Sequence, residues 1–418
     1  MLVRVELRRD AGRFDRRSGP WIRRRQVSRV LGPPDPTALA ELVSHRGETL
    51  GFGLYSPDSG IVVRLLSLGA TPPSETWLDD RISVALAARA SLGLGVEGGD
   101  TDGYREINSE GDGLPGLVVD RFGDQRVIQV TTAPMAARIE AIAAQLRACI
   151  GVEGTVVLAP EAAAVKEHFT PGCRRFDAHG AELSSDTELS SDAPHPGFGP
   201  LHWREGELLL QAPAPPGQKT GAYHDQRLNR RRFAALAAVQ AGPVLDLGCH
   251  VGGFAIAAAR ARRAAGAAPV PTVAVDQSKV ALAAAEANAA ANEVTIETVR
   301  ADMFGALDDP ALAGPFGAIV FDPPKVAGER RDLKRALGAM TRVVTKLLAR
   351  LDRGGVMAVC SCSHHLGVPE LDAAMFDAAE RCGRACTRIA TWGPGPDHPV
   401  WLNHAQGEYL RVAVYQRR

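Results

Sequence analysis

Short apolar runs alternate with longer helical segments most clearly in the last part of the chain. Strands are expected at residues 243–247 and 272–276, because each is a compact run of mainly Val, Leu and Ala. Helices are expected at residues 254–265 and 280–292, which are rich in alanine. A glycine-rich turn, residues 248–253, joins the first strand to the first helix. This order predicts a βαβ unit with a ligand site at the carboxyl edge of its parallel strands.

Two other regions precede this one. Residues 1–70 mix short Val and Leu runs with turn residues, which predicts a small β-rich domain. Residues 76–190 alternate strand and helix patterns, with helices expected near residues 83–92 and 136–149, so a central α/β domain is expected. A stretch rich in Ser, Asp, Gly and Pro then leads to the third domain, residues 201–418. The chain as a whole is predicted to be an α/β protein.

Composition and charge exclude several classes of protein. The 418 residues include 48 Lys and Arg and 48 Asp and Glu, so affinity for nucleic acid must come from a local patch. Arginines outnumber acids in residues 4–29, which form either a solvated arm or an RNA-facing surface. No run reaches the roughly 18 apolar residues of a membrane span. The cysteines show no disulfide framework, and no leader pattern opens the chain. A cytoplasmic protein with no membrane partner is therefore expected.

Acids recur at the strand ends of the third domain. Asp246, Asp276, Asp302 and Asp322 each lie in or directly after an apolar run. The glycine-rich turn reads Gly-x-x-x-Gly-Gly, which does not satisfy the dinucleotide pattern Gly-x-Gly-x-x-Gly. Asp276 suits a pair of ribose hydroxyls and Asp302 an adenine amine. These acids in this order favour S-adenosylmethionine, which has no pyrophosphate to neutralise; the alternative for any one of them is a helix or turn cap.

A thiol and an acid follow two of the later strands. Asp322 opens an Asp-Pro-Pro-Lys turn, and Cys360-Ser-Cys362-Ser ends a later apolar run. Parallel strands end at one edge of a sheet, so both groups are expected in one crevice. Cys362 is the candidate nucleophile because the apolar run has ended before it, whereas Cys360 is expected to be buried. The two cysteines and the histidine pair after them lack the spacing of a zinc site, so no metal is expected.

Longer motifs add a resemblance to a known family. They are Gly19-Pro20-Trp21-Ile22, residues 108–117, 120–123, 218–221, 225–227 and 251–254, the Asp-Pro-Pro-Lys and Ser-Cys-Ser turns, and Asp397-His398-Pro399. Over nearly its whole length the chain resembles the class I S-adenosylmethionine-dependent methyltransferases that form 5-methylcytosine in large-subunit (23S) ribosomal RNA. The resemblance implies a PUA-like RNA-binding domain at residues 1–70, the central domain at residues 76–190 and a Rossmann-like methyltransferase domain at residues 201–418.

The resemblance also implies which residues act. Enzymes of this kind add a thiolate to carbon 6 of cytosine, a role that falls to Cys362, while Asp322 would hold the ring nitrogen or the exocyclic amine. The group that removes the carbon 5 proton stays open between Asp322, Lys325 and water. The residues expected to bind the cofactor are Lys219, Thr220, Gly221, Gln226, Asp246, Gly248, Gly252, Gly253, Asp276, Asp302 and Asp322.

The implied partner is large-subunit ribosomal RNA, with the target base flipped out or single-stranded. Arg227, Arg230, Arg231 and Arg232 are expected to face its phosphates. Two other functions remain open at this point. One is methylation of an exocyclic amine or a guanine nitrogen in RNA, for which Cys362 would be dispensable, and the other is a non-enzymatic assembly factor that binds RNA. The sequence does not name the modified nucleotide, and it leaves open whether the protein is a homodimer.

Overall fold

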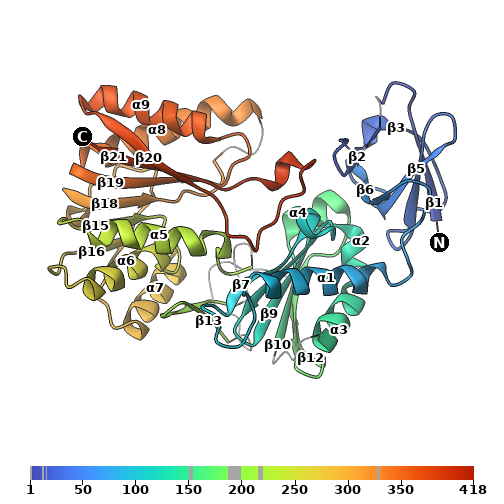
Figure 1. Ribbon diagram of the computed structural model, residues 1–418, viewed down its shortest axis with the longest axis horizontal. Coiled ribbons are helices and arrows are strands. Elements are labelled where there is room, and N and C mark those ends of the chain that lie inside the picture. Colours follow the sequence, from blue (N-terminus) through green and yellow to red (C-terminus); the bar gives the residue numbers. More distant parts are fainter. Residues whose placement is uncertain are drawn as a thin grey trace.

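Three β-sheets and a hairpin follow one another along the chain in the computed structural model, which describes residues 2–11, 14–15, 17–149, 154–186, 199–214, 220–326 and 330–418. Figure 1 shows the first sheet near the N-terminus, the second below it with its helices, and the third at the C-terminal end. The predicted α/β fold class, with a β-rich N-terminal part and a Rossmann-like C-terminal part, is confirmed.

The N-terminal part of the chain forms the first sheet and contains almost no helix. The order of this sheet is β2-β6-β5-β4-β1-β3, and β1 runs parallel to β4. The strands are β1 (Leu2–Leu7), β2 (Trp21–Arg23), β3 (Val27–Leu31), β4 (Leu39–Val43), β5 (Thr49–Tyr55) and β6 (Ile61–Leu68). Alternate residues of β1, Val3, Val5 and Leu7, are buried, as the period of two in a strand requires. Their burial gives this sheet a core of its own.

The second sheet has helices on one face and a hairpin on the other. Its order is β12-β11-β10-β9-β8-β7. The elements are β7 (Gly103–Asn108), β8 (Leu117–Phe122), β9 (Gln125–Val130), β10 (Gly154–Ala159), β11 (Gly172–Asp177), β12 (Glu182–Asp186), α1 (Trp77–Ser91), α2 (Ala133–Ala136), α3 (Ile139–Cys149) and α4 (Glu161–Glu167). Residues of α1 and α3 share one apolar core with the sheet. The hairpin of β13 (Leu201–Glu205) and β14 (Leu208–Ala212) packs on the opposite face.

The third sheet follows the order β17-β16-β15-β18-β19-β21-β20. Its strands are β15 (Val244–Leu247), β16 (Thr272–Asp276), β17 (Glu297–Arg300), β18 (Phe316–Phe321), β19 (Leu351–Ser361), β20 (Cys386–Trp392) and β21 (Arg411–Arg417). β15 pairs in parallel with both β16 and β18. The chain therefore runs outward to β17 on one side, and it returns to add β18 on the other. The carboxyl ends of β15 and β18 flank this reversal, where open α/β sheets bind their ligands.

Helices cover both faces of the third sheet. They are α5 (Arg227–Ala238), α6 (Gly253–Ala264), α7 (Lys279–Ala291), α8 (Leu333–Ala349) and α9 (Val368–Cys382). Successive residues of β18 point to opposite faces, so Ile319 and Phe321 share a core with α8 and α9, while Ala318 and Val320 share one with α5 and α6. Figure 1 shows the two layers above and below the strands. None of the helices in the described part of the chain has the length and apolarity to cross a membrane.

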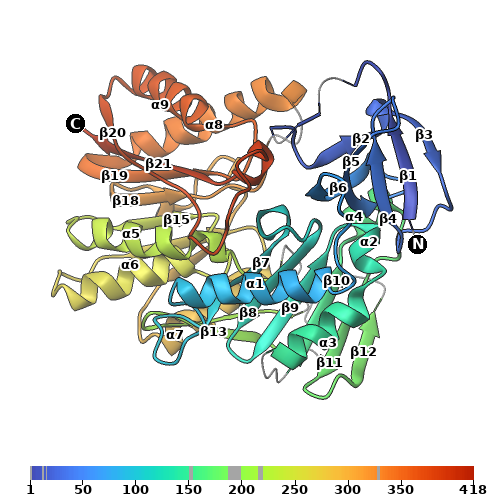
Figure 2. The same ribbon diagram turned by 45° about the vertical axis from the view of Figure 1, so that its right-hand side comes forward.

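The connection between β20 and β21 links all three parts of the molecule. Figure 2 shows it leaving its own sheet and reaching toward the other two. In this connection, Pro399 accepts a hydrogen bond from Asn108 Nδ2 in the second domain at 2.9 Å, and Asn403 Nδ2 donates to the carbonyl of Ser18 at 3.0 Å. The ring of His404 lies 4.6 Å from that of Trp21 in the N-terminal domain. The Asp-His-Pro motif thus belongs to a junction between domains.

A buried ion pair also joins the N-terminal domain to the second. Arg64 of β6 lies 2.7 Å from Glu167 at the end of α4, with each side chain 6% exposed. We predict that Arg64→Met destabilises this contact by about 3–5 kcal/mol, because Glu167 is left charged, buried and unpaired. Limited proteolysis between the two domains and thermal unfolding would measure the effect. Arg29→Met is the control, since Arg29 is 64% exposed in its pair with Glu6. An equal effect of both changes would contradict the prediction.

His224 lies buried at the junction of the hairpin with the second sheet, and we expect it to make stability depend on pH. Its ring lies 4.7 Å from that of Phe122 and 5.7 Å from that of Trp203. Neither ring nitrogen has a hydrogen-bond partner among the described residues. Burial lowers the pKa of His224 below its usual 6.5, although Asp120 and Glu205 partly oppose this shift. As pH falls, His224 is therefore protonated in the unfolded chain before it is protonated in the folded one. Protonation then favours the unfolded state, so the folded protein loses stability as pH falls below about 6.5.

We therefore predict that His224→Leu flattens the pH dependence of unfolding between about pH 7 and 5, the window set by the usual His pKa. Urea midpoints measured across that window test it. The change His45→Leu, at an exposed position, is the matched control and should leave the slope as in the wild type. A slope that does not change in His224→Leu would mean that His224 binds its proton alike in the folded and the unfolded chain, contrary to the prediction.

Candidate functional site

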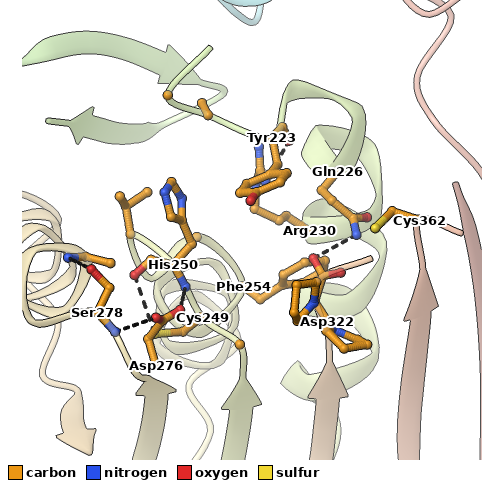
Figure 3. Close-up of a pocket in the computed structure, with 18 of the residues that line it drawn as sticks. Tyr223, Gln226, Arg230, Cys249, His250, Phe254, Asp276, Ser278, Asp322 and Cys362 are labelled. Carbon is orange, nitrogen blue, oxygen red and sulfur yellow. Dashed lines mark hydrogen bonds between the residues drawn. The ribbon is translucent and has the colours of Figure 1, made fainter. Parts of the chain in front are cut away.

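A cavity of about 680 Å³ opens at the carboxyl ends of β15, β16, β18 and β19. The segment that precedes α5 forms the opposite wall, through Gly221, Tyr223 and Gln226. Figure 3 shows Tyr223 and Gln226 facing the strand ends across the cavity. The cavity therefore lies at the reversal of strand order between β15 and β18, and it has room for a ligand the size of a nucleoside.

The glycine-rich turn after β15 brings the backbone close to this cavity. Gly248 has φ +91°, and a Cβ there would lie 2.4 Å from the carbonyl oxygen of Asp322. Gly252 has φ +83° and packs against Ala285, so its part is structural. Gly248 and Gly253 line the cavity, whereas Gly252 does not. The turn thus provides a surface without side chains where the backbone can meet a ligand.

Asp276 lies where a carboxylate could bind the hydroxyls of a ribose. It ends β16, and its two carboxylate oxygens accept hydrogen bonds from the backbone amides of His250 at 3.0 Å and Ser278 at 2.9 Å. These bonds orient the carboxylate, which lines the cavity (Figure 3). A carboxylate can accept further hydrogen bonds, so this one can bind two neighbouring hydroxyls. The glycine turn and Asp276 together fit the nucleoside part of S-adenosylmethionine.

Two of the predicted acids do not reach the cavity. Asp246 is fully buried under the glycine-rich turn, where it accepts a hydrogen bond from the Ala255 amide at 3.0 Å. Burial, with Asp322 and Asp276 nearby, raises the pKa of Asp246 to about 8. Asp302 is exposed and accepts a hydrogen bond from the Phe304 amide at 2.9 Å, which makes it a turn cap. Asp246 therefore caps the first turn of α6, and neither acid lines the cavity.

The segment before α5 divides between the cavity and the second domain. Gly221 and Gln226 line the cavity, and Lys219 lies outside the described residues. The hydroxyl of Thr220 instead donates to Asp120 of the second sheet, whose carboxylate also pairs with Arg105 at 2.8 Å. Thr220 is fully buried in this contact. Thr220 therefore anchors the cavity wall to the second domain, and it does not itself line the cavity.

The three predicted catalytic residues meet in the cavity. Asp322 follows β18, Cys362 follows the paired strand β19, and both line the cavity together with Lys325. In Figure 3 the sulfur of Cys362 lies beside Gln226, which donates through Nε2 to Asp322 Oδ2 at 2.9 Å. Cys360 is fully buried inside β19 and does not line the cavity, and burial raises the pKa of its thiol well above the usual range. The distinction drawn between the two cysteines thus agrees with their positions.

The structure corrects the expectation for two arginines of α5. Arg230 is buried and forms an ion pair with Glu205, and it also donates to the carbonyl of Tyr223 at 3.1 Å. Arg227 is likewise buried, 3.5 Å from Asp397. Neither faces solvent, so neither can meet RNA phosphates as predicted. Their charges are used inside the protein, because a buried guanidinium requires an acidic partner.

Several wall residues were not expected from the sequence, Tyr223 and Met303 among them. Tyr223 lines the cavity with its ring 5.1 Å from that of His250, and burial with nearby Asp322 raises the pKa of its hydroxyl. Met303 also lines it, next to the predicted Asp302. An aromatic residue in a loop carries no local signal, whereas the proximity of Met303 to a strand end could have suggested it. Within the described residues, no His, Cys, Asp and Glu group of three or more is arranged to hold a metal.

Comparisons with known proteins place these features in a family. Residues 5–68 match a PUA-like domain, and residues 232–385 match the methyltransferase small domain. Two solved structures share the fold over nearly the whole chain: a proposed SAM-dependent methyltransferase from Streptococcus mutans, with 17% identity, a TM-score of 0.75 and 99% of each chain covered, and a proposed methyltransferase complexed with SAH, with 18% identity, a TM-score of 0.75 and 100% of each chain covered.

Curated relatives are similar over the same length. The "Ribosomal RNA large subunit methyltransferase" of Deinococcus radiodurans is 31% identical over 418 residues, which cover 99% of this chain and 97% of that protein. The "Ribosomal RNA large subunit methyltransferase I" of Photobacterium profundum is 30% identical over 400 residues, with 95% and 94% covered. The chain therefore belongs to the ribosomal RNA large subunit methyltransferase family.

Proposed function

We propose that this protein methylates carbon 5 of a cytosine in large-subunit ribosomal RNA through a covalent adduct between Cys362 and the base. Membership of its family makes it an S-adenosylmethionine-dependent methyltransferase of large-subunit ribosomal RNA. The choice of carbon 5 rests on one observation. Cys362 and Asp322 stand at the ends of paired strands and open onto the same cavity.

A thiol in this position suits carbon 5 because that atom is a weak nucleophile in free cytosine. Attack of the Cys362 thiolate on carbon 6 forms a C–S bond and moves electron density to carbon 5, which can then attack a methyl group. S-adenosylmethionine supplies that methyl group as an electrophile. Loss of the carbon 5 proton then returns electrons to the ring and breaks the C–S bond, which restores the thiolate. Transfer to an amine would need no thiol at this point.

Asp322 would bind the Watson–Crick edge of the base during this reaction. A carboxyl group at N3 and the exocyclic amine can favour the electron shift that follows thiolate attack. The two prolines after Asp322 fix the turn that carries it. Lys325 also lines the cavity, so it and Asp322 are the two protein candidates for removal of the carbon 5 proton, with water as the third.

The cofactor would occupy the part of the cavity between the glycine turn and Asp276. Gly248 and Gly253 would meet it through the backbone, and Asp276 would bind the ribose. The target base would have to leave its stack to reach Cys362, as bases do in enzymes that modify them inside a pocket. The PUA-like domain would bind the RNA backbone, with exposed arginines such as Arg23 and Arg25 near its Trp21.

We predict that Cys362→Ala abolishes formation of 5-methylcytosine, whereas Cys360→Ser preserves it. The first change removes the nucleophile, and the second replaces a buried thiol that does not line the cavity while it keeps a group that can hydrogen-bond with Gln226. Labelled S-adenosylmethionine and large-subunit ribosomal RNA, followed by nucleoside analysis, would test both variants and identify the modified base. A methylated amine or guanine that persists in Cys362→Ala would favour the alternative chemistry. No labelled RNA from the wild type would favour an assembly factor.

We also predict that Asp276→Asn weakens S-adenosylmethionine binding about tenfold or more, because hydrogen bonds to a charged group contribute about 1.5–3 kcal/mol. Titration calorimetry of the purified protein measures this directly. Asp302→Asn is the matched control and should bind as the wild type does, since Asp302 is exposed and does not line the cavity. Weaker binding in Asp302→Asn, with normal binding in Asp276→Asn, would contradict the prediction and assign cofactor binding to Asp302.

A further inference from the structure

We propose that Gln226 is a positioning residue for Asp322, held in the required orientation by Asn229 and Arg232. This inference rests on the function proposed above and assigns to Gln226 a role other than cofactor binding. Gln226 Nε2 donates to Asp322 Oδ2 at 2.9 Å, and Asn229 Nδ2 donates to Gln226 Oε1 at 2.8 Å. Arg232 Nη1 in turn donates to Asn229 Oδ1 at 3.3 Å.

The direction of this chain of hydrogen bonds is set at its outer end. A guanidinium is only a donor, so Arg232 requires the oxygen of Asn229 to face it. The amide nitrogen of Asn229 must then point the other way, toward the oxygen of Gln226. As a result, Gln226 presents its own nitrogen to Asp322. Each amide is thereby fixed against a flip that would place oxygen next to a carboxylate.

Burial makes this arrangement rigid. Gln226 is 2% exposed and Asn229 is fully buried, whereas Arg232 lies at the surface. The segment that carries Gln226 is held further by its neighbour Asp225, whose Oδ2 accepts a hydrogen bond from the Tyr409 hydroxyl at 2.7 Å. Water cannot readily replace the lost partner at such a site, so removal of one bond would leave a buried polar group unsatisfied.

Asp322 needs a restraint of this kind. The prolines after it fix only the backbone, so the orientation of its carboxylate depends on side-chain contacts such as the hydrogen bond from Gln226. A hydrogen bond from a neutral amide holds one oxygen in place and adds no charge near Asp246 and Asp276, which lie close enough to influence one another. Gln226 would thus keep the plane of the Asp322 carboxylate aligned with the edge of the target base, a requirement of the chemical step.

Two substitutions of nearly equal size test this role. Gln226→Glu replaces the donor next to Asp322 with an acceptor, and Asn229→Asp offers Gln226 an acceptor that should turn its amide around. We expect kcat at neutral pH to fall about tenfold to a hundredfold in each, the range for loss of a hydrogen bond to a charged group. The affinity for S-adenosylmethionine should stay within about twofold, which also shows that the variants are folded.

A pH profile adds a readout that a purely structural defect would not give. In Gln226→Glu the two carboxyl groups can share one proton, which restores a donor, so kcat should recover in part as pH falls. Gln416→Glu makes the same chemical change at an exposed amide that donates to the Gly354 carbonyl, and it should behave as the wild type.

The outcomes separate this inference from the proposed function. The absence of 5-methylcytosine from the wild type would overturn both. Wild-type product with unchanged kcat in Gln226→Glu and Asn229→Asp would overturn only the positioning role. Loss of S-adenosylmethionine affinity in proportion to kcat would also overturn it, since Gln226 would then belong to the cofactor site. A fall in kcat with intact cofactor affinity and partial recovery at lower pH supports it.

Discussion

The close approach of two turns is the constraint on which the site depends. A Cβ at Gly248 would lie 2.4 Å from the carbonyl oxygen of Asp322, so the turn after β15 and the turn after β18 can touch only because this residue is glycine. That contact brings the glycine-rich turn beside the Asp-Pro-Pro-Lys turn. Asp276 and Cys362 then complete the cavity from the strands on either side, β16 and β19. The proposed binding sites for the cofactor and for the target base would thus share one wall.

The rest of the molecule holds the opposite wall in place. Thr220 is tied to Asp120 of the second sheet, and Asp225 to Tyr409, which precedes β21. Arg230 connects the same segment to the hairpin through Glu205. These contacts are polar and largely buried, so they require particular geometry in the second sheet, the hairpin and the C-terminal part. The second domain therefore acts on the site by anchoring the segment that carries Gln226, in addition to any contact it makes with RNA.

Sequence patterns predicted the strands, turns and strand-end acids that local sequence determines. The strand around Val244, the turn at Gly248 and the acid at Asp276 follow from hydrophobic runs and their ends, and Cys362 was distinguished from Cys360 because the apolar run ends between them. The patterns misplaced Arg230, since its partner Glu205 lies on a separate hairpin. Likewise Asp302 follows a strand, as a ligand-binding acid would, but caps its own turn. The partner of Arg230 is distant in sequence and leaves no periodic signal, whereas an acid after a strand has the same local pattern whether it binds a ligand or caps its turn.

Trapping of the covalent adduct is the most direct test of the central claim. Large-subunit ribosomal RNA made with 5-fluorocytidine offers no removable proton at the target carbon after methyl transfer, so the C–S bond should persist. We expect a covalent protein–RNA complex that requires S-adenosylmethionine, with the modified nucleotide localised by mass spectrometry to Cys362 itself. Attachment at Cys360, or methylation of unmodified RNA with no trapped complex, would contradict it.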